Sequence, residues 1–154
     1  MALREAYLTL HRETDSSLSS CGITADQFVV LTALRQDEAR TQRELVERTS
    51  SDPSTLRAML VLLEKKGLVE RPAHPTDGRA RRVKLTAAGR QIFEQAWSLT
   101  NALRARISGA LQAIELENLI ESLETVVRQM AGSPAPRLRQ HDQKSEQKHP
   151  GKLE

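Results

Sequence analysis

The chain has 154 residues and a formal net charge of +3, and aromatic residues make up only 3% of it. Its length is that of about one domain, which argues against an enzyme with separate cofactor and substrate lobes. Abundant leucine and 28% charged residues are typical of a mostly helical soluble protein rather than a β-sandwich or β-barrel. No apolar run approaches the roughly 20 residues of a membrane span, and a single cysteine excludes an internal disulfide. We therefore expect a cytoplasmic protein that contacts no membrane.

The charge is distributed unevenly along the chain. Residues 41–90 carry eleven basic and six acidic groups, a net charge of +5, whereas residues 1–40 and 91–131 each have a net charge of −2. A basic segment between two acidic ones indicates a polyanion-binding module, although a charged face is more often simply solvated. Charge alone leaves both interpretations open.

Capping signals divide the first part of the chain into helices. The first predicted helix covers residues 2–19, where apolar residues recur every three or four positions. Capping boxes of Thr24 with Gln27 and of Thr41 with Glu44 begin two further helices. The second of these is short, and a longer helix follows it after a turn, which makes the pair a helix-turn-helix candidate.

That longer helix, predicted over residues 52–66, is the strongest candidate for a DNA-reading element. Asp52 is its N-cap, Pro53 is its first helical residue and Gly67 ends it. Its inward face carries Leu56, Met59, Leu60 and Leu63, and its outward face carries Ser54, Arg57, Ala58, Val61 and Lys65. Small residues allow close approach to a major groove, and Arg57 can bind a guanine with two hydrogen bonds. The alternative is an ordinary solvated helix face.

A cationic hairpin and long helices are predicted in the rest of the chain. The short runs 68–71 and 81–85 form the only sheet that we expect. Thr86 caps a helical region with a bend near 109–112, and the polar residues 132–154 are expected to be a disordered tail. Basic side chains gather in the hairpin, namely Arg71, His74, Arg79, Arg81, Arg82 and Lys84. Such a wing can place an arginine in the minor groove, where negative potential is concentrated.

Two runs in this region resemble a known family. The run from Asp77 to Gly89 (DGRARRVKLTAAG) is similar to the wing signature of the MarR family of bacterial transcriptional regulators. The run from Leu63 to Arg71 (LEKKGLVER) is similar to the link between recognition helix and wing in that family. The order of elements resembles the family over residues 2–131.

The resemblance implies a mainly α fold with a small β wing in a single domain over residues 1–131. Residues 24–85 would form a winged helix-turn-helix, and residues 2–20 and 86–131 would supply dimerisation helices. The implied function is that of a homodimeric, sequence-specific repressor of transcription that binds a palindromic operator in double-stranded DNA.

The resemblance also assigns roles residue by residue. Arg79 matches the wing arginine that enters the minor groove, and Asp77 matches its acidic partner. Ser54, Thr55 and Arg57 match recognition-helix positions that touch bases and phosphates. Gln42 matches a position that contacts the DNA backbone. The full set of expected DNA contacts is Gln42, Ser54, Thr55, Arg57, Lys65, Asp77, Arg79 and Arg81.

Members of the family also sense small molecules or oxidants. Phenolic or lipophilic effectors bind in a cleft between the dimerisation helices and the winged domain. The candidate lining residues here are Tyr7, His11, Phe28 and Trp97, although aromatic residues at helical spacing are more often core packing. Redox-sensing members use a cysteine early in the first helix, whereas Cys21 lies at the end of that helix. Peroxide sensing through Cys21 is therefore disfavoured.

Two other functions compete with a DNA-binding regulator. A winged-helix module that binds an acidic protein is disfavoured, because the outward face of the 52–66 helix is small and basic rather than apolar. An enzyme is disfavoured because the sequence holds no nucleophile elbow, phosphate-cradling glycine loop or metal motif. His11 and His74 are too isolated to indicate a metal site, and we expect no cofactor.

Overall fold

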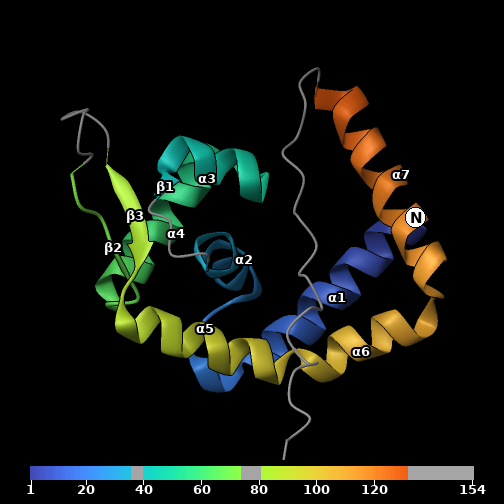
Figure 1. Ribbon diagram of the computed structural model, residues 1–154, viewed down its shortest axis with the longest axis horizontal. Coiled ribbons are helices and arrows are strands. Elements are labelled where there is room, and N and C mark those ends of the chain that lie inside the picture. The colour runs from blue at the N-terminus through green and yellow to red at the C-terminus, as the bar shows by residue number, and fades with distance from the viewer. Residues whose placement is uncertain (36–39, 74–80, 132–154) are drawn as a thin grey trace, which may run out of the picture.

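The computed structural model describes residues 1–35, 40–73 and 81–131. Figure 1 shows the short helices and the sheet grouped around α2, with α1, α6 and α7 extending to one side. This arrangement confirms the predicted class, mainly α with a small β wing. The elements in chain order are α1 (Ala2–Leu18), the 3-10 turn η1 (Ser19–Cys21), α2 (Ala25–Leu34), β1 (Arg40–Thr41), α3 (Gln42–Thr49), α4 (Pro53–Lys65), β2 (Val69–Glu70), β3 (Arg82–Leu85), α5 (Ala87–Leu99), α6 (Asn101–Ala110) and α7 (Ala113–Ala131).

The predicted helix starts are confirmed by their capping hydrogen bonds. At α2 the backbone N–H of Gln27 donates to the Thr24 hydroxyl at 3.2 Å, and the N–H of Thr24 donates to the Gln27 side chain at 3.4 Å. Thr41 caps α3 with the same reciprocal pattern. Asp52 caps α4 and Thr86 caps α5. Each cap satisfies backbone N–H groups that have no partner within the helix.

The sheet contains a strand that the sequence did not predict. β3 lies between β1 and β2, and both pairs are antiparallel. The predicted hairpin is confirmed by β2 and β3, where Val69 pairs with Leu85. β1 adds a third strand, in which Arg40 pairs with Val83. The expectation that the hairpin is the only sheet element was wrong, because a two-residue strand carries no alternation pattern of its own.

The C-terminal helical region contains one more break than the sequence predicts. The expected bend near 109–112 is present, because α6 ends at Ala110 and α7 begins at Ala113. A second interruption falls at Thr100, between α5 and α6. Thr100 is buried, and its hydroxyl donates to the backbone carbonyl of Ala96 at 2.9 Å. Such back-bonding competes with helix geometry, and apolar periodicity gives no sign of it.

The apolar core joins the helix-turn-helix to the sheet. Leu31 of α2, Leu45 of α3, Leu60 of α4 and Val83 of β3 are at most 1% exposed. Each such side chain contributes about 1.5–3 kcal/mol relative to an exposed one. The core therefore holds α4 and the wing as one unit.

α1 and α7 leave apolar side chains in contact with solvent. The large apolar residues more than a third exposed on these two helices are Leu3, Tyr7, Leu8 and Leu10 of α1, and Ile114, Leu119, Ile120, Leu123, Val126, Val127 and Met130 of α7. Apolar surface of this extent marks an interaction site. Within the described ranges, no single helix is long and apolar enough to cross a membrane. One bent pair of helices in these ranges has the length and composition of a span, namely α1 with η1 followed by α2, and the two parts meet at a 76° bend.

Some predictions concern residues that lie outside the described ranges. These are the wing residues His74, Asp77 and Arg79 and the tail over 132–154. Cys21 lies in η1, half-buried against the core, as expected for a small residue packed in a turn.

Candidate nucleic-acid interface

α4 presents the outward face that the sequence predicts, with one difference. Leu56, Leu60 and Leu63 are completely buried, and Met59 packs partly buried against the core. The opposite face exposes Ser54, Thr55, Arg57, Ala58 and Lys65. Val61, expected on this face, is half-buried. Leu62 is also exposed, at 48%. Apart from it, this face is small and basic, which is what a helix needs to approach a major groove closely.

Asp52 fixes the start of this face. Its Oδ1 accepts the backbone N–H of Ser54 at 2.8 Å, the N–H of Thr55 at 3.1 Å and the Ser54 hydroxyl at 2.5 Å. These bonds, with the Ser54 hydroxyl as the largest cause, hold the pKa of Asp52 below its ordinary value. Because the Ser54 hydroxyl proton is directed at Asp52, the Ser54 oxygen is left as an acceptor. An acceptor suits the amino group of a base better than a phosphate.

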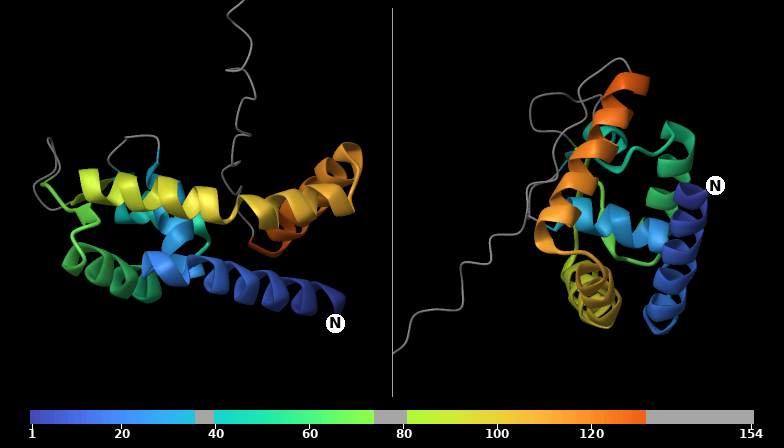
Figure 2. Two further views of the ribbon diagram at one scale, coloured as in Figure 1. Left: turned by 90° about the horizontal axis from the view of Figure 1, so that it is seen from below. Right: turned by 90° about the vertical axis from the view of Figure 1, so that its right-hand side faces the viewer.

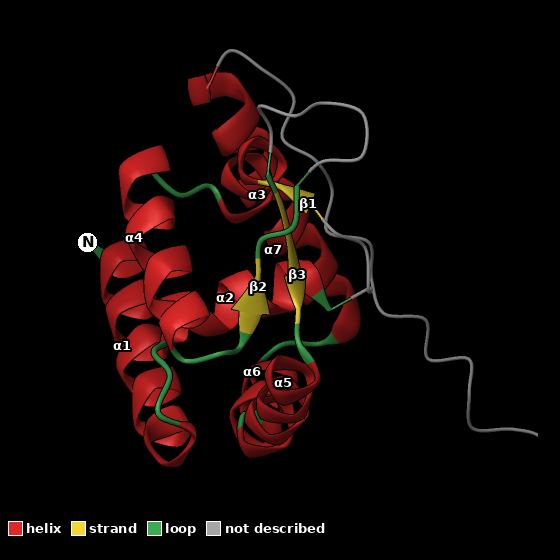
Figure 3. Ribbon diagram, turned by 90° about the vertical axis from the view of Figure 1, so that its left-hand side faces the viewer, coloured by secondary structure: helices red, strands yellow, loops and turns green. Residues whose placement is uncertain are grey.

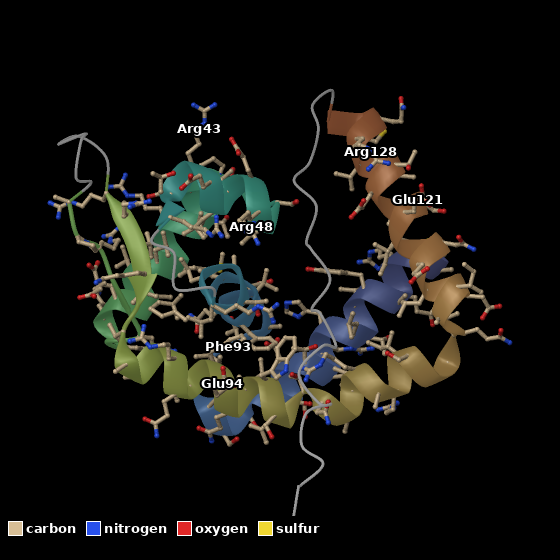
Figure 4. The ribbon with its side chains drawn as sticks, in the orientation of Figure 1. Arg43, Arg48, Phe93, Glu94, Glu121 and Arg128 are labelled. Carbon is tan, nitrogen blue, oxygen red and sulfur yellow. The ribbon has the colours of Figure 1, made fainter. Side chains whose placement is uncertain are left out.

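α3 meets the first turn of α4 through Gln42. Its Nε2 donates to the backbone carbonyl of Pro53 at 3.4 Å. Arg43, the next residue along the chain, has a side chain that is 90% exposed and lies 3.4 Å from Glu47. Figure 4 shows Arg43 pointing away from the body of the molecule. Sequence reasoning did not single out Arg43, although it is a cation in the helix that precedes α4.

Two of the hairpin cations are held by acidic partners. Arg71 Nε lies 3.0 Å from Oε2 of Glu64 in α4. Lys84 Nζ lies 2.9 Å from Oε1 of Glu70, its pairing partner across β2 and β3. These two cations of the predicted set are therefore held in ion pairs at the base of the wing. Figure 3 shows the two strands of the wing, β2 and β3, side by side. Arg81 is exposed, and its Nη1 donates to the carbonyl of Arg71 at 3.4 Å.

A cavity of about 410 Å³ lies between α1, α2 and the α5–α6 region, and Arg48 of α3 also contributes to its wall. All four residues proposed from the sequence as effector-lining contribute to its wall: Tyr7, His11, Phe28 and Trp97. Phe28 and Trp97 also pack around Phe93, with ring centroids 6.0 Å and 5.8 Å from it. The two predicted roles, cavity lining and core packing, are thus combined in the same side chains.

An arginine lies over the tryptophan ring in this cavity. The guanidinium carbon of Arg104 is 3.8 Å from the Trp97 ring centroid, and that of Arg35 is 5.4 Å from it. Arg104 donates to the Thr100 hydroxyl at 2.6 Å and to the Trp97 carbonyl at 2.8 Å. Partial burial lowers the pKa of Arg104, and Arg48 of α3 lines the same cavity. Arg48 comes from a helix far from Trp97 in the chain, so no local motif indicates that it lines this cavity, whereas Arg104 follows Trp97 by seven residues.

His11 is not isolated, contrary to the sequence-based expectation. Its Nδ1 lies 3.3 Å from Asp15 and its Nε2 lies 3.4 Å from Asp26 of α2. Asp15 also accepts the backbone N–H of Ala25 at 2.6 Å. Asp15 is visible from the sequence at helical spacing from His11, but Asp26 comes near only because α1 packs on α2.

A capped helix pair, a second helix with a small basic outward face and an antiparallel wing beside it define a winged helix-turn-helix protein. Residues 23–80 match the model of the MarR family. The chain is 33% identical over 117 residues to the HTH-type transcriptional repressor Rv2887 of Mycobacterium tuberculosis, a match that covers 74% of this chain and 84% of the relative. It is 39% identical over 111 residues to the multiple antibiotic resistance protein MarR of Escherichia coli, covering 71% and 77%. The chain belongs to the MarR family.

Solved structures give the same result. A mutant of Escherichia coli MarR complexed with operator DNA superposes with a TM-score of 0.74 at 35% identity, covering 82% of this chain and 91% of that one. The transcriptional repressor CouR bound to a 23-mer DNA duplex has a TM-score of 0.74 at 28% identity, covering 82% and 90%. The resemblance read from the two sequence runs is therefore confirmed.

Proposed function

We propose that this chain is a homodimeric transcriptional repressor that places one α4 in each of two successive major grooves of a palindromic operator. The observation that carries the proposal is the outward face of α4, where Arg57 and Lys65 stand among small residues over three buried leucines. Relatives named as repressors and neighbours solved with DNA support it. A regulator that reads chromosomal DNA acts in the cytoplasm of a bacterium.

The dimer follows from the exposed apolar residues of α1 and α7. Apolar side chains cover the length of α7, from Ile114 to Met130, and Figure 1 shows this helix standing away from the rest of the chain. A second copy that buries these residues would gain about 25 cal/mol for each Å² of apolar surface. The same dimer would present two α4 helices to DNA, as a palindrome requires.

The competing functions have less support. A module that binds only acidic proteins does not account for the DNA-bound structures of similar chains. An enzyme finds no support among relatives that are named as transcriptional regulators. The small basic face of α4 therefore favours DNA over a protein surface.

Selection of bound duplexes from a random pool by the purified protein tests the proposal. We expect enrichment of an inverted repeat whose half-site centres lie roughly 34–36 Å apart, one helical turn of DNA. The mass of the complex should correspond to two chains per duplex. A salt-sensitive background without any enriched repeat would contradict the proposal.

The cavity supports a second role, the binding of a small effector. Its aromatic and aliphatic wall fits a flat phenolic or lipophilic molecule, and Arg104 stacked on Trp97 could hold a polar or anionic substituent. Because Trp97 is the sole tryptophan of the chain, a bound ligand should quench its fluorescence and raise the melting temperature. A Trp97→Phe variant should lose the fluorescence signal and show a smaller thermal shift, because it alters the cavity wall and the ring under Arg104. A set of small phenols that changes neither quantity would contradict this role.

A further inference from the structure

The C-terminal end of α4 is the point where the recognition helix meets two other helices. The backbone N–H of Gly67 donates to Glu64 at 2.9 Å and that of Leu68 donates to Leu63 at 2.9 Å. Gly67 has a φ of 69°, in the left-handed region that glycine adopts without steric cost. The turn over residues 66–68, here called the α4 exit turn, thus closes the helix by backbone geometry alone.

Lys66 ties the exit turn to the junction of α1 and α2. Its ammonium donates to the backbone carbonyl of Gly22, 44 residues earlier, at 2.5 Å and to Oε1 of Gln27 at 3.3 Å. Gln27 is only 5% exposed, and the same side-chain oxygen accepts the N–H of Thr24 in the capping box of α2. One ammonium therefore reaches both the end of η1 and the start of α2.

The opposite side of the exit turn is held by the start of α5. The Thr86 hydroxyl donates to the carbonyl of Gly67 at 2.7 Å, and the Thr86 N–H donates to the carbonyl of Leu68 at 3.1 Å. A Cβ at Gly89 would lie 1.9 Å from the Leu68 carbonyl oxygen, so the two segments approach as closely as backbones can. This side is rigid without any charged group.

α1 and α5 lead from this turn toward the proposed dimer interface. Figure 2 shows α1 and the α5–α6 pair running along the long axis of the molecule toward α7, with α4 beyond the C-terminal end of α1. The angle between α4 and α1 therefore decides where each recognition helix stands in a dimer. On the α1 side, the described side-chain bond from the exit turn is that of Lys66.

We propose that Lys66 is a positioning residue that fixes α4 relative to α1 and so sets the half-site spacing that the dimer accepts. The inference rests on the proposed dimeric DNA-binding function. Lys66 acts through Gly22 and Gln27 rather than through DNA, because its ammonium is directed at those two oxygens. Lys65, one residue earlier on the exposed face of α4, is the residue that we assign to DNA.

Binding to duplexes of altered spacing tests this role. The probes are the selected inverted repeat and versions whose spacer is one base pair longer or shorter, which shifts a half-site by about 3.4 Å and turns it by about 35°. We expect Lys66→Met to reduce the preference for the cognate spacer by about threefold to tenfold, and to leave the salt dependence of binding unchanged. Lys66→Arg, which keeps a charged donor, should restore most of the preference.

Lys65→Met is the matched contrast on the neighbouring residue. It should weaken binding to all spacers alike and make the salt slope shallower by about one unit. The same result from Lys66→Met would make Lys66 a phosphate contact and overturn the proposal. A Lys66→Met variant that only melts at a lower temperature, with unchanged spacer preference, would assign it a merely structural role and also overturn it.

A distance measurement without DNA separates this proposal from the proposed function. Spin labels attached at Ala58→Cys, in a Cys21→Ser background, report the distance between the two α4 helices of a dimer by double electron–electron resonance. We expect a narrow distribution in the parent and a broader one with Lys66→Met. The milder variant Lys66→Gln should broaden the distance distribution less, and it replaces Lys66→Met in this measurement if Lys66→Met does not fold. Equal distributions in all variants would overturn the proposal, whereas the absence of any inter-chain distance would contradict the dimer itself.

Discussion

Arg71, at the start of the wing, is paired with Glu64 of the recognition helix, with 3.0 Å between Nε and Oε2. The Arg71 side chain is 24% exposed, so the guanidinium is turned toward α4 rather than toward solvent. Lys84 likewise forms an ion pair with Glu70. Arg71 and Lys84 are thus held in ion pairs at the base of the wing, whereas Arg81 is exposed and remains a proposed DNA contact.

Replacing Glu64 by Gln tests whether the Arg71–Glu64 ion pair orients the wing or acts only through its charge. Removing an acidic group near DNA should raise affinity for nonspecific duplex, whereas freeing Arg71 should loosen the wing and lower the ratio of specific to nonspecific binding. The stability cost should stay below about 1 kcal/mol, because the pair is partly exposed. Titrations against the selected operator and a scrambled duplex measure the ratio.

The control is Glu94→Gln, the same charge change on α5, where Glu94 is exposed. It should leave the specificity ratio unchanged. An equal effect of both variants on that ratio would show that charge, and not the Glu64–Arg71 pair, is responsible.

Replacing Arg79 by Ala should weaken binding to specific and nonspecific DNA together. Loss of one phosphate-neutralising cation makes the slope of log affinity against log salt shallower by about one unit. The measurement is a salt titration of binding, with Arg106→Ala on α6 as a variant of equal charge. An unchanged slope for Arg79→Ala would remove Arg79 from the set of DNA contacts.

The Asp52 cap predicts an acid-dependent component of stability. Its folded-state pKa lies below the ordinary value of 3.8, so the capping carboxylate stabilises the fold above that pH. This contribution is lost as the pH falls through the folded-state value. We expect the melting-temperature difference between the wild type and Asp52→Ala to be largest at neutral pH and to shrink below pH 3.8.

Asp52→Asn is the control for this titration. An amide keeps an acceptor for the backbone N–H groups but does not titrate, so its difference from Asp52→Ala should not vary with pH. The melting-temperature difference between the wild type and Asp52→Ala could instead be constant from neutral pH to pH 3. That result would show that the charge of Asp52 contributes nothing to the cap.

Local signals predicted most of the fold. The caps at Thr24 and Asp52 follow from the hydroxyl or carboxylate of one residue and the N–H groups of the next few, so the sequence contains all that is needed. β1 and the break at Thr100 were not predicted, because the first depends on pairing with the distant β3 and the second on a hydroxyl that bonds the preceding turn.

The candidate site was predicted less completely. The outward face of α4 follows from helical periodicity, and the wing from a family resemblance. Asp26 comes near His11 only through the packing of α1 on α2, which no single-sequence pattern reports. Arg104 follows Trp97 by seven residues, a helical spacing, but neither this pairing nor the break at Thr100 between them was predicted. The same is true of Lys66, whose partner at Gly22 is a backbone carbonyl 44 residues away.

The most direct test of the central claim is the random-pool selection carried out with the wild type beside Arg57→Ala. If α4 reads the major groove, the wild type enriches an inverted repeat. Arg57→Ala should then enrich the same repeat with relaxed preference at one position in each half-site, a loss of about 1–3 kcal/mol for a bidentate contact. If the wild type and Arg57→Ala enrich the same repeat with the same preference at every position, Arg57 does not recognise a base. If the wild type enriches no repeat, the claim that this protein is a sequence-specific DNA-binding regulator is contradicted.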